Sequence, residues 1–185
     1  MTTINDVVRR PQRADARRNF DALIAAAREV FSDDGSNASL EEIARRAGVG
    51  IGTLYRNFPT REALLEAVYV EEVQALGRAA DGVLDLEPWD ALETWLYRFL
   101  EYLRTKRALV EGLNKTSEVM TVCRTAMYEA GGPVLARAQA AGVARDDVTI
   151  EDAVRMLAGV SAVVYSDDAQ RERVLGVTID ALRSR

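Results

Sequence analysis

The sequence contains no histidine, and its only cysteine is Cys123. A histidine-based catalytic triad or a zinc site built from Cys and His ligands therefore cannot be assembled. A single cysteine also excludes a disulfide within the chain and fits a reducing cytoplasm, where we expect the protein to act. No apolar run approaches the roughly 20 residues needed to span a bilayer, and the N-terminal residues lack the apolar segment of a secretory signal. We expect no metal, no cofactor and no membrane contact.

Helix-breaking residues are also scarce. The 185 residues include four prolines and twelve glycines, while 48% are hydrophobic and 29% are charged. Alanine and leucine recur throughout, which favours helix over sheet, and the apolar residues recur at helical spacing. We therefore predict an all-α fold with a kink or break at Gly131-Gly132-Pro133. The expected helices cover about 14–32, 39–47, 50–57, 60–82, 89–103, 108–119, 121–141, 150–164 and 168–182.

The net charge of −5 is unevenly distributed along the chain. Residues 1–60 carry nine arginines against eight acidic residues, whereas residues 61–185 carry fifteen basic residues against twenty-one acidic ones. This asymmetry indicates a mildly basic N-terminal segment followed by an acidic remainder. A basic segment of this kind suits contact with nucleic acid. The alternative is a solvated tail without a partner. The first eighteen residues contain only two acidic residues but five arginines, namely Arg9, Arg10, Arg13, Arg17 and Arg18.

Two short helices flank the turn Ala47-Gly48-Val49. Helices below about twelve residues are marginal in water, so both must share a core with the helix predicted at 14–32. Ser39 is the expected N-cap of the first short helix, and Glu42 would complete a capping box. A glycine-containing turn within a three-helix unit is typical of the helix-turn-helix. The expected core comprises Phe20, Leu23, Ile24, Ala27, Phe31, Leu40, Ile43, Ala44, Ile51, Leu54 and Phe58.

A helix-turn-helix presents its last helix to the major groove of B-DNA, which is ~12 Å wide. Glycines there let backbone amides approach the DNA closely, and hydroxyl, guanidinium and amide groups can bond to phosphates or bases. The alternative is a helix pair in a bundle that never touches DNA. The outward residues of this last helix are expected to be Gly50, Gly52, Thr53, Tyr55, Arg56 and Asn57.

The stretch LEEIARRAGVGIGTLYRNFPTREALLEAV closely resembles the helix-turn-helix signature of the TetR family of transcriptional regulators. The specific resemblance covers about residues 20–68. It implies a helix-turn-helix DNA-binding domain with a basic N-terminal arm at 1–59, and a helical ligand-binding and dimerisation domain at 60–185. The resemblance further implies a homodimer that binds a double-stranded DNA operator, with no catalytic activity.

Individual roles follow from the same resemblance. Ser39, at the start of its helix, would bind a phosphate, and Arg61 would clamp a second one. Thr53 and Tyr55 match positions that contact DNA in the family. The arginine-rich arm would lie on the DNA backbone or in an adjacent minor groove.

The helical domain at 60–185 is expected to bind a small, mostly apolar effector, since aromatic and methionine side chains recur on its middle helices. The alternative is that these side chains simply form the core. The candidate ligand-binding residues are Trp95, Phe99, Tyr102, Met120, Cys123, Met127, Tyr128 and Met156.

An apolar stripe on the last two helices is the predicted dimer seam, although it could instead close the core of one protomer. Small residues beside it would permit close approach of two helices. The stripe comprises Ile150, Val154, Leu157, Val160, Val164, Val174, Val177 and Leu182.

The leading functional hypothesis is a repressor released from a palindromic operator by its effector. A regulator of the same fold that has no effector, or that activates transcription, is the alternative. An enzyme is a third hypothesis, and a helical scaffold that binds only protein is a fourth. The sequential acidic pairs Glu71-Glu72, Asp146-Asp147 and Asp167-Asp168 diverge by about 100° on a helix and are expected to face solvent, which argues against paired-carboxylate catalysis.

Overall fold

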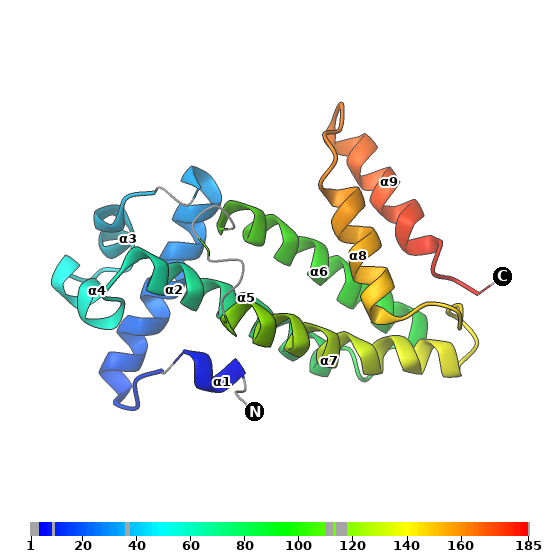
Figure 1. Ribbon diagram of the computed structural model, residues 1–185, viewed down its shortest axis with the longest axis horizontal. Helices are drawn as coiled ribbons and strands as arrows, with labels where there is room; N and C mark the ends of the chain where they lie inside the picture. Colours follow the sequence, from blue (N-terminus) through cyan, green and yellow to red (C-terminus); the bar gives the residue numbers. More distant parts are fainter. Residues whose placement is uncertain (1–3, 9, 36–37, 110–112, 114–117, 185) are drawn as a thin grey trace. The chain divides into compact units, whose positions relative to one another are not determined.

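The computed structural model describes residues 4–8, 10–35, 38–109, 113 and 118–184 (Figure 1). The prediction of an all-α fold is confirmed. None of the described helices combines the length and the apolar character that crossing a membrane requires. The helices are α1 (Ile4–Val7), α2 (Ala14–Asp34), α3 (Leu40–Arg46), α4 (Ile51–Asn57), α5 (Arg61–Gly82), α6 (Pro88–Leu109), α7 (Glu118–Ala140), α8 (Ile150–Ser161) and α9 (Asp168–Asp180).

The chain forms two compact units. The first unit comprises Met1–Gln74 and Arg104–Arg124, and the second comprises Ala75–Leu103 and Thr125–Arg185. Helices α5, α6 and α7 are therefore each divided between the units. The domain boundary predicted between residues 59 and 60 stays a prediction.

The first unit is built around one apolar face of α2. Phe20, Leu23 and Phe31 lie on this face and are buried together with Leu54 and Phe58 from the segment around α4. The rings of Phe20 and Phe58 are 4.9 Å apart between centroids, in a tilted arrangement. This packing gives α3 and α4 the support that seven-residue helices lack on their own.

The ends of these helices follow local chemistry. Gly35 ends α2 with φ of 73°, a left-handed conformation that favours glycine, and its N–H donates to the Phe31 carbonyl at 2.9 Å. Thr60 caps α5, because its hydroxyl accepts the N–H of Ala63 at 3.1 Å. The helix α1 and its position in the basic arm were not predicted. The short helix predicted at 108–119 lies largely outside the described residues.

The second unit is built around Trp95 of α6. Its ring stacks on Phe99 at 6.1 Å between centroids, and its Nε1–H donates to the Leu76 carbonyl at 3.1 Å. Of the expected kink or break at Gly131-Gly132-Pro133, the break is wrong, because α7 continues through all three residues, and the kink stays a prediction. A Cβ added at Gly131 would lie 2.3 Å from the Trp95 ring. Glycine is therefore present for close packing and does not end the helix.

Helices α8 and α9 pack side by side in the second unit (Figure 1). Thr149 and Asp152 form a capping box at the start of α8. The predicted dimer seam is divided: Val154, Leu157 and Leu182 are buried within the protomer, whereas Val164 is 94% and Val177 is 69% exposed. Val174 is 36% exposed as well, and Ile150 and Val160 are half-buried.

Candidate nucleic-acid interface

The turn between α3 and α4 is fixed by backbone hydrogen bonds. Gly48 has φ of 69°, and its N–H donates to the Arg45 carbonyl at 3.1 Å. The N–H of Val49 donates to the Ala44 carbonyl at 3.0 Å. These two bonds form a Schellman motif, in which the left-handed residue is best supplied by glycine. The turn therefore sets the direction in which α4 leaves α3.

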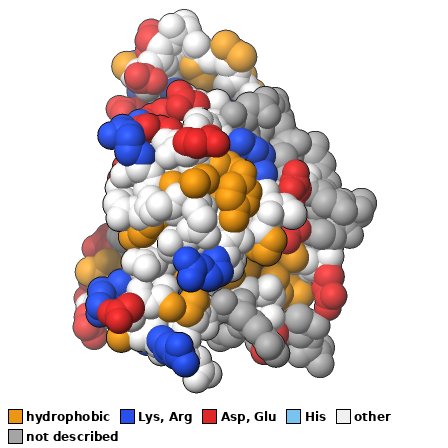
Figure 2. All heavy atoms as spheres, turned by 90° about the vertical axis from the view of Figure 1, so that its left-hand side faces the viewer, with side chains coloured by type: hydrophobic (Ala, Val, Ile, Leu, Met, Phe, Trp, Pro, Cys, Tyr) orange, Lys and Arg blue, Asp and Glu red, His pale blue; other side chains and the backbone are white. Residues whose placement is uncertain are grey.

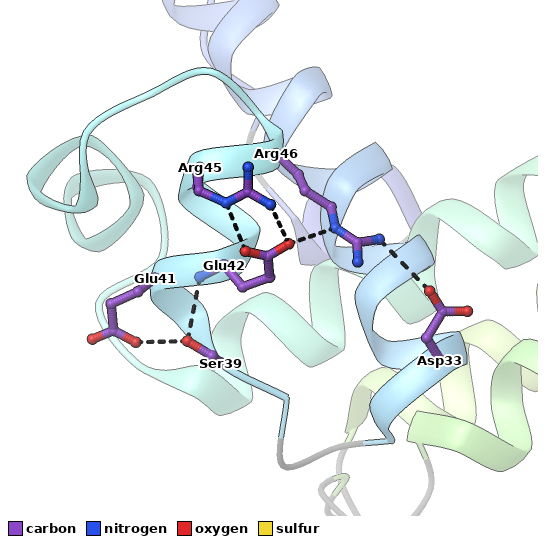
Figure 3. A network of polar contacts seen from close by, with 6 residues as sticks. All are labelled: Asp33, Ser39, Glu41, Glu42, Arg45 and Arg46. Carbon is purple, nitrogen blue, oxygen red and sulfur yellow. Dashed lines mark hydrogen bonds and ion pairs between the residues drawn. The ribbon is translucent and has the colours of Figure 1, made fainter.

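Ser39 begins α3 and uses its hydroxyl twice. The oxygen accepts the N–H of Glu42 at 3.2 Å, and the hydroxyl donates to the Glu41 carboxylate at 3.0 Å (Figure 3). The helix backbone and the Ser39 hydroxyl both lower the pKa of Glu41. Because its proton is already engaged, the Ser39 hydroxyl must leave Glu41 before it can donate to a phosphate.

Glu42 does not complete the predicted capping box. Its carboxylate instead accepts hydrogen bonds from Arg45 and Arg46, with three contacts of 2.8 Å (Figure 3). These bonds lower the pKa of Glu42 to about 2. Arg46 also lies 3.6 Å from the Asp33 carboxylate, which connects α3 to α2. The network orients two basic side chains along the surface of α3.

Helix α4 has one buried face and one exposed face. Leu54 faces the core, while Gly50, Gly52, Tyr55 and Arg56 are exposed as predicted. Tyr55 is the largest of these, with 47% of its surface accessible. In Figure 2, basic and acidic side chains alternate on this side of the molecule, with hydrophobic side chains exposed between them. Binding of a partner to such a mixed surface would not depend on charge alone.

Two predicted outward residues of α4 are only partly exposed. Thr53 and Asn57 are both half-buried, and the Asn57 amide donates to the Thr53 carbonyl at 2.8 Å. This bond is internal to α4, so it occupies one of the two N–H groups that Asn57 could offer to DNA.

Ile51 was expected in the core, and that expectation is wrong. Its side chain is 37% exposed in the first turn of α4, because Leu54 and Phe58 already fill the space against α2. Ile51 precedes Tyr55 by four residues and therefore lies on the same face of the helix. It also precedes the buried Leu54 by three residues, so spacing alone does not decide whether Ile51 faces the core or solvent.

Arg61, the predicted phosphate clamp, lies at the start of α5. Its Nη1 donates to the Ala38 carbonyl at 2.6 Å, so the guanidinium lies beside the residue that precedes Ser39. Its positive charge contributes to the lowered pKa of Glu41. Arg61 and Ser39 are thus brought together at the start of α3, although they are 22 positions apart in sequence.

The basic arm folds back on the first unit. Arg10 lies 2.8 Å from the Glu71 carboxylate of α5 and 3.2 Å from Asp21 of α2. Arg18 pairs with Asp15, and Arg17 donates to the carbonyls of residues 11 and 12. Arg9 lies outside the described residues. The described arginines of the arm, other than Arg13, therefore have partners within the protein that DNA would have to replace.

The expectation that Glu71 and Glu72 face solvent is wrong for Glu72, while Glu71 is half-buried. Glu72 is buried, and its carboxylate lies 2.9 Å from the Arg28 side chain of α2. No local spacing connects residues 28 and 72, so only the tertiary structure could reveal this pair. The pairs Asp146-Asp147 and Asp167-Asp168 are exposed, as expected.

The eight candidate ligand residues are divided between the two units. Trp95, Phe99 and Tyr102 make a continuous buried stack in the second unit, where Phe99 and Tyr102 are 5.6 Å apart between centroids. Met127 is buried, Tyr128 is half-buried and Met156 is 36% exposed in the same unit. The remaining two residues, Met120 and Cys123, lie in the first unit.

Two families match this chain. Residues 23–68 match the family described as "Bacterial regulatory proteins, tetR family". Residues 87–184 match "Transcriptional regulator SbtR-like, C-terminal domain". The first match spans α3, α4 and the turn between them, and the second spans α6 to α9.

Two solved structures resemble the chain in both sequence and fold. The TetR transcriptional regulator SCO0520 from Streptomyces coelicolor is 41% identical, with a TM-score of 0.78 over 89% of this chain and 98% of that one. The TetR transcription regulatory protein from Mycobacterium vanbaalenii is 32% identical, with a TM-score of 0.73 over 94% and 99%.

Curated relatives match over shorter stretches. The HTH-type transcriptional regulator SAR0097 of Staphylococcus aureus is 27% identical over 108 residues, or 57% of this chain and 56% of the relative. The HTH-type transcriptional regulator UidR of Escherichia coli is 38% identical over 58 residues, or 30% of each chain. The chain thus spans about half the length of the first relative and less than a third of the second.

Proposed function

Because the chain belongs to the TetR family of bacterial transcriptional regulators, we propose that it is a homodimeric repressor of a palindromic operator. A small, mostly apolar molecule would release it from the DNA. The family consists of regulators and not of enzymes, so the site is a binding surface and has no catalytic residues.

The exposed face of α4 carries this proposal. Gly50, Gly52, Tyr55 and Arg56 are open to solvent, while Leu54 anchors the opposite face in the core. A helix held in this way can enter the major groove without disturbing the packing beneath it. Ser39 and Arg61, which lie together at the start of α3, would bind phosphate on the rim of the groove.

Exposed apolar residues of α9 and of the loop that joins it to α8 support a dimer. Val163, Val164, Val174 and Val177 are all accessible in the protomer. A two-fold axis through this surface would present two copies of α4 to half-sites about 34 Å apart, or a multiple of that distance. A palindromic operator would follow from the same symmetry.

A cleft of about 280 Å³ in the second unit is the place we propose for the effector. Its lining is largely apolar and includes Val83, Leu84 and Pro133, with Asp81 and Glu129 at the same site. It also includes Gly77 and Ala130, which are adjacent in sequence to the two residues that contact Trp95. Occupancy should therefore change the fluorescence of Trp95. The volume, at the lower limit of typical ligand pockets, favours a small molecule.

Selection of bound sequences from random double-stranded DNA tests the proposal. The purified protein should enrich one palindromic site, and ultracentrifugation should show one dimer on each duplex. Enrichment of no sequence would refute the proposed function. Enrichment of a single half-site bound by a monomer would refute the dimer only.

The alternative is a regulator without an effector. The buried stack of Trp95, Phe99 and Tyr102 favours it, because Gly131 lies directly against the Trp95 ring and leaves no room there. Titration of a small-molecule library, with tryptophan fluorescence as the signal, separates the two. Under the repressor proposal, any compound that binds must bind more weakly when operator DNA is present, by the factor with which it weakens DNA binding.

A further inference from the structure

Ile51 is the exposed apolar side chain in the first turn of α4. Gly50 and Gly52 flank Ile51, and a Cβ added at either glycine would meet no heavy atom within 4 Å. The space on both sides of Ile51 is therefore open. An isoleucine that is 37% exposed between two glycines stands out from the surface around it.

Packing of α4 against the core does not require the Ile51 side chain. Leu54 and Phe58 are nearly fully buried and hold α4 against α2 without it. Tyr55 follows four residues later, on the same face, and is 47% exposed. Ile51 and the Tyr55 ring thus form one apolar ridge, which we call the Ile51–Tyr55 ridge, along the face that the proposed function assigns to DNA.

The chemistry of the ridge restricts what it can recognise. Isoleucine has no hydrogen-bonding group, so it cannot read the donors and acceptors of guanine, adenine or cytosine. The thymine C5-methyl is the apolar group that a base edge presents in the major groove. Resting on the proposed function, we infer that the Ile51–Tyr55 ridge contacts a thymine methyl group in each half-site.

The other side chains of α4 have different parts in recognition. Thr53 and Arg56 offer polar groups to the neighbouring bases or phosphates, whereas the Asn57 amide is engaged with the Thr53 carbonyl. Discrimination at the position under Ile51 therefore depends on the methyl group. A cytosine at that position would lose the contact, and so would a uracil.

Replacement of single thymines by deoxyuridine tests the inference, since this change removes only the methyl group. Each thymine of the selected operator is replaced in turn, symmetrically in both half-sites, and Kd is measured by fluorescence anisotropy at fixed salt. One buried methyl contributes about 0.8 kcal/mol, so one symmetric pair of positions should weaken binding about fifteenfold. The other positions should change Kd by less than twofold.

A variant then assigns the effect to the ridge. In Ile51→Ala the uracil penalty at that pair should fall below about threefold, while helicity stays unchanged because Ile51 is exposed. Leu86→Ala, a change of an exposed leucine in the second unit, should keep the full penalty. An operator that binds tightly but is indifferent to uracil at every position, or a penalty that survives in Ile51→Ala, would overturn the inference and leave the proposed function standing. Failure to select any site would overturn both.

Discussion

Replacement of Gly131 by alanine should destabilise the second unit, although alanine is the better helix former. A Cβ at Gly131 would lie 2.3, 2.7 and 2.8 Å from three atoms of the Trp95 ring. The ring cannot easily move, because it is fully buried, stacked on Phe99 and hydrogen-bonded to the Leu76 carbonyl. Overpacking of this kind costs about 1–3 kcal/mol, while the change of glycine to alanine within a helix gains about 1 kcal/mol. Because three ring atoms are approached closer than 3 Å, the cost should exceed the gain, and we expect a net loss of up to about 2 kcal/mol.

The adjacent glycine provides a matched control. A Cβ at Gly132 would have as its nearest neighbour a methyl group of Ile150 at 4.0 Å, an ordinary contact. Gly132→Ala should therefore stabilise the protein by up to about 1 kcal/mol. For a chain of this size each kcal/mol shifts Tm by about 2–4 °C, so the two variants should melt on opposite sides of the wild type.

Circular dichroism melts and urea titrations at one protein concentration measure these differences. In a Trp95→Leu background, where the clash is relieved, Gly131→Ala should no longer be destabilising. The packing argument fails if Gly131→Ala is as stable as Gly132→Ala, or if its effect is the same with and without the Trp95 ring.

Three further outcomes follow from the charged and reactive groups. Burial raises the pKa of the Cys123 thiol to about 12, so a thiol reagent at pH 8 should label the native protein very slowly and the urea-unfolded protein fast; fast native labelling would show that the thiol is accessible. The pKa of Glu42 is lowered to about 2 by Arg45 and Arg46, so its ion pairs stabilise the folded state above about pH 4.5 and that stabilisation is lost as the pH falls toward 2. The difference in unfolding free energy between wild type and Glu42→Gln should be present at pH 6 and gone at pH 2, and a constant difference would contradict this. The double variant Asp21→Asn with Glu71→Gln removes both carboxylate partners of Arg10 and should free it for a phosphate. It should tighten non-specific DNA binding and steepen the slope of log K against log salt by up to about 0.9 per protomer; an unchanged slope would mean that Arg10 does not reach DNA.

The N-termini of α3 and α8 show what a local sequence rule can and cannot predict. The capping box predicted at Ser39 with Glu42 does not form, whereas one forms at Thr149 with Asp152. Asp152 is free to bond back to Thr149 because Arg155 pairs with Glu151 instead. Glu42 has two arginines within reach on the following turn, and both compete successfully for its carboxylate. The capping-box motif considers only the N-cap residue and the residue three positions later. Whether the box forms at Ser39 depends also on Arg45 and Arg46, which the motif does not include.

The remaining differences have tertiary causes. Helix periodicity predicted the extent of α2 and α5 and most of the first unit's core, because these helices bury one regular face. It misplaced Ile51, since a seven-residue helix offers too few turns to define its buried face. The pairing of Glu72 with Arg28 and of Arg10 with Glu71 joins segments far apart in sequence. Spacing carries no information about such contacts.

We propose that the exposed face of α4 recognises the operator. Tyr55 on α4 and Tyr97 on α6 are 47% and 46% exposed, so truncating either to alanine removes a similar surface. The decisive measurement is the affinity of Tyr55→Ala and Tyr97→Ala for the selected operator relative to random DNA, with helicity followed by circular dichroism. A lost base contact costs about 1–3 kcal/mol of discrimination, so Tyr55→Ala should lose at least tenfold of its specificity while Tyr97→Ala keeps the wild-type ratio. Full specificity in Tyr55→Ala, with both variants folded, would contradict the claim.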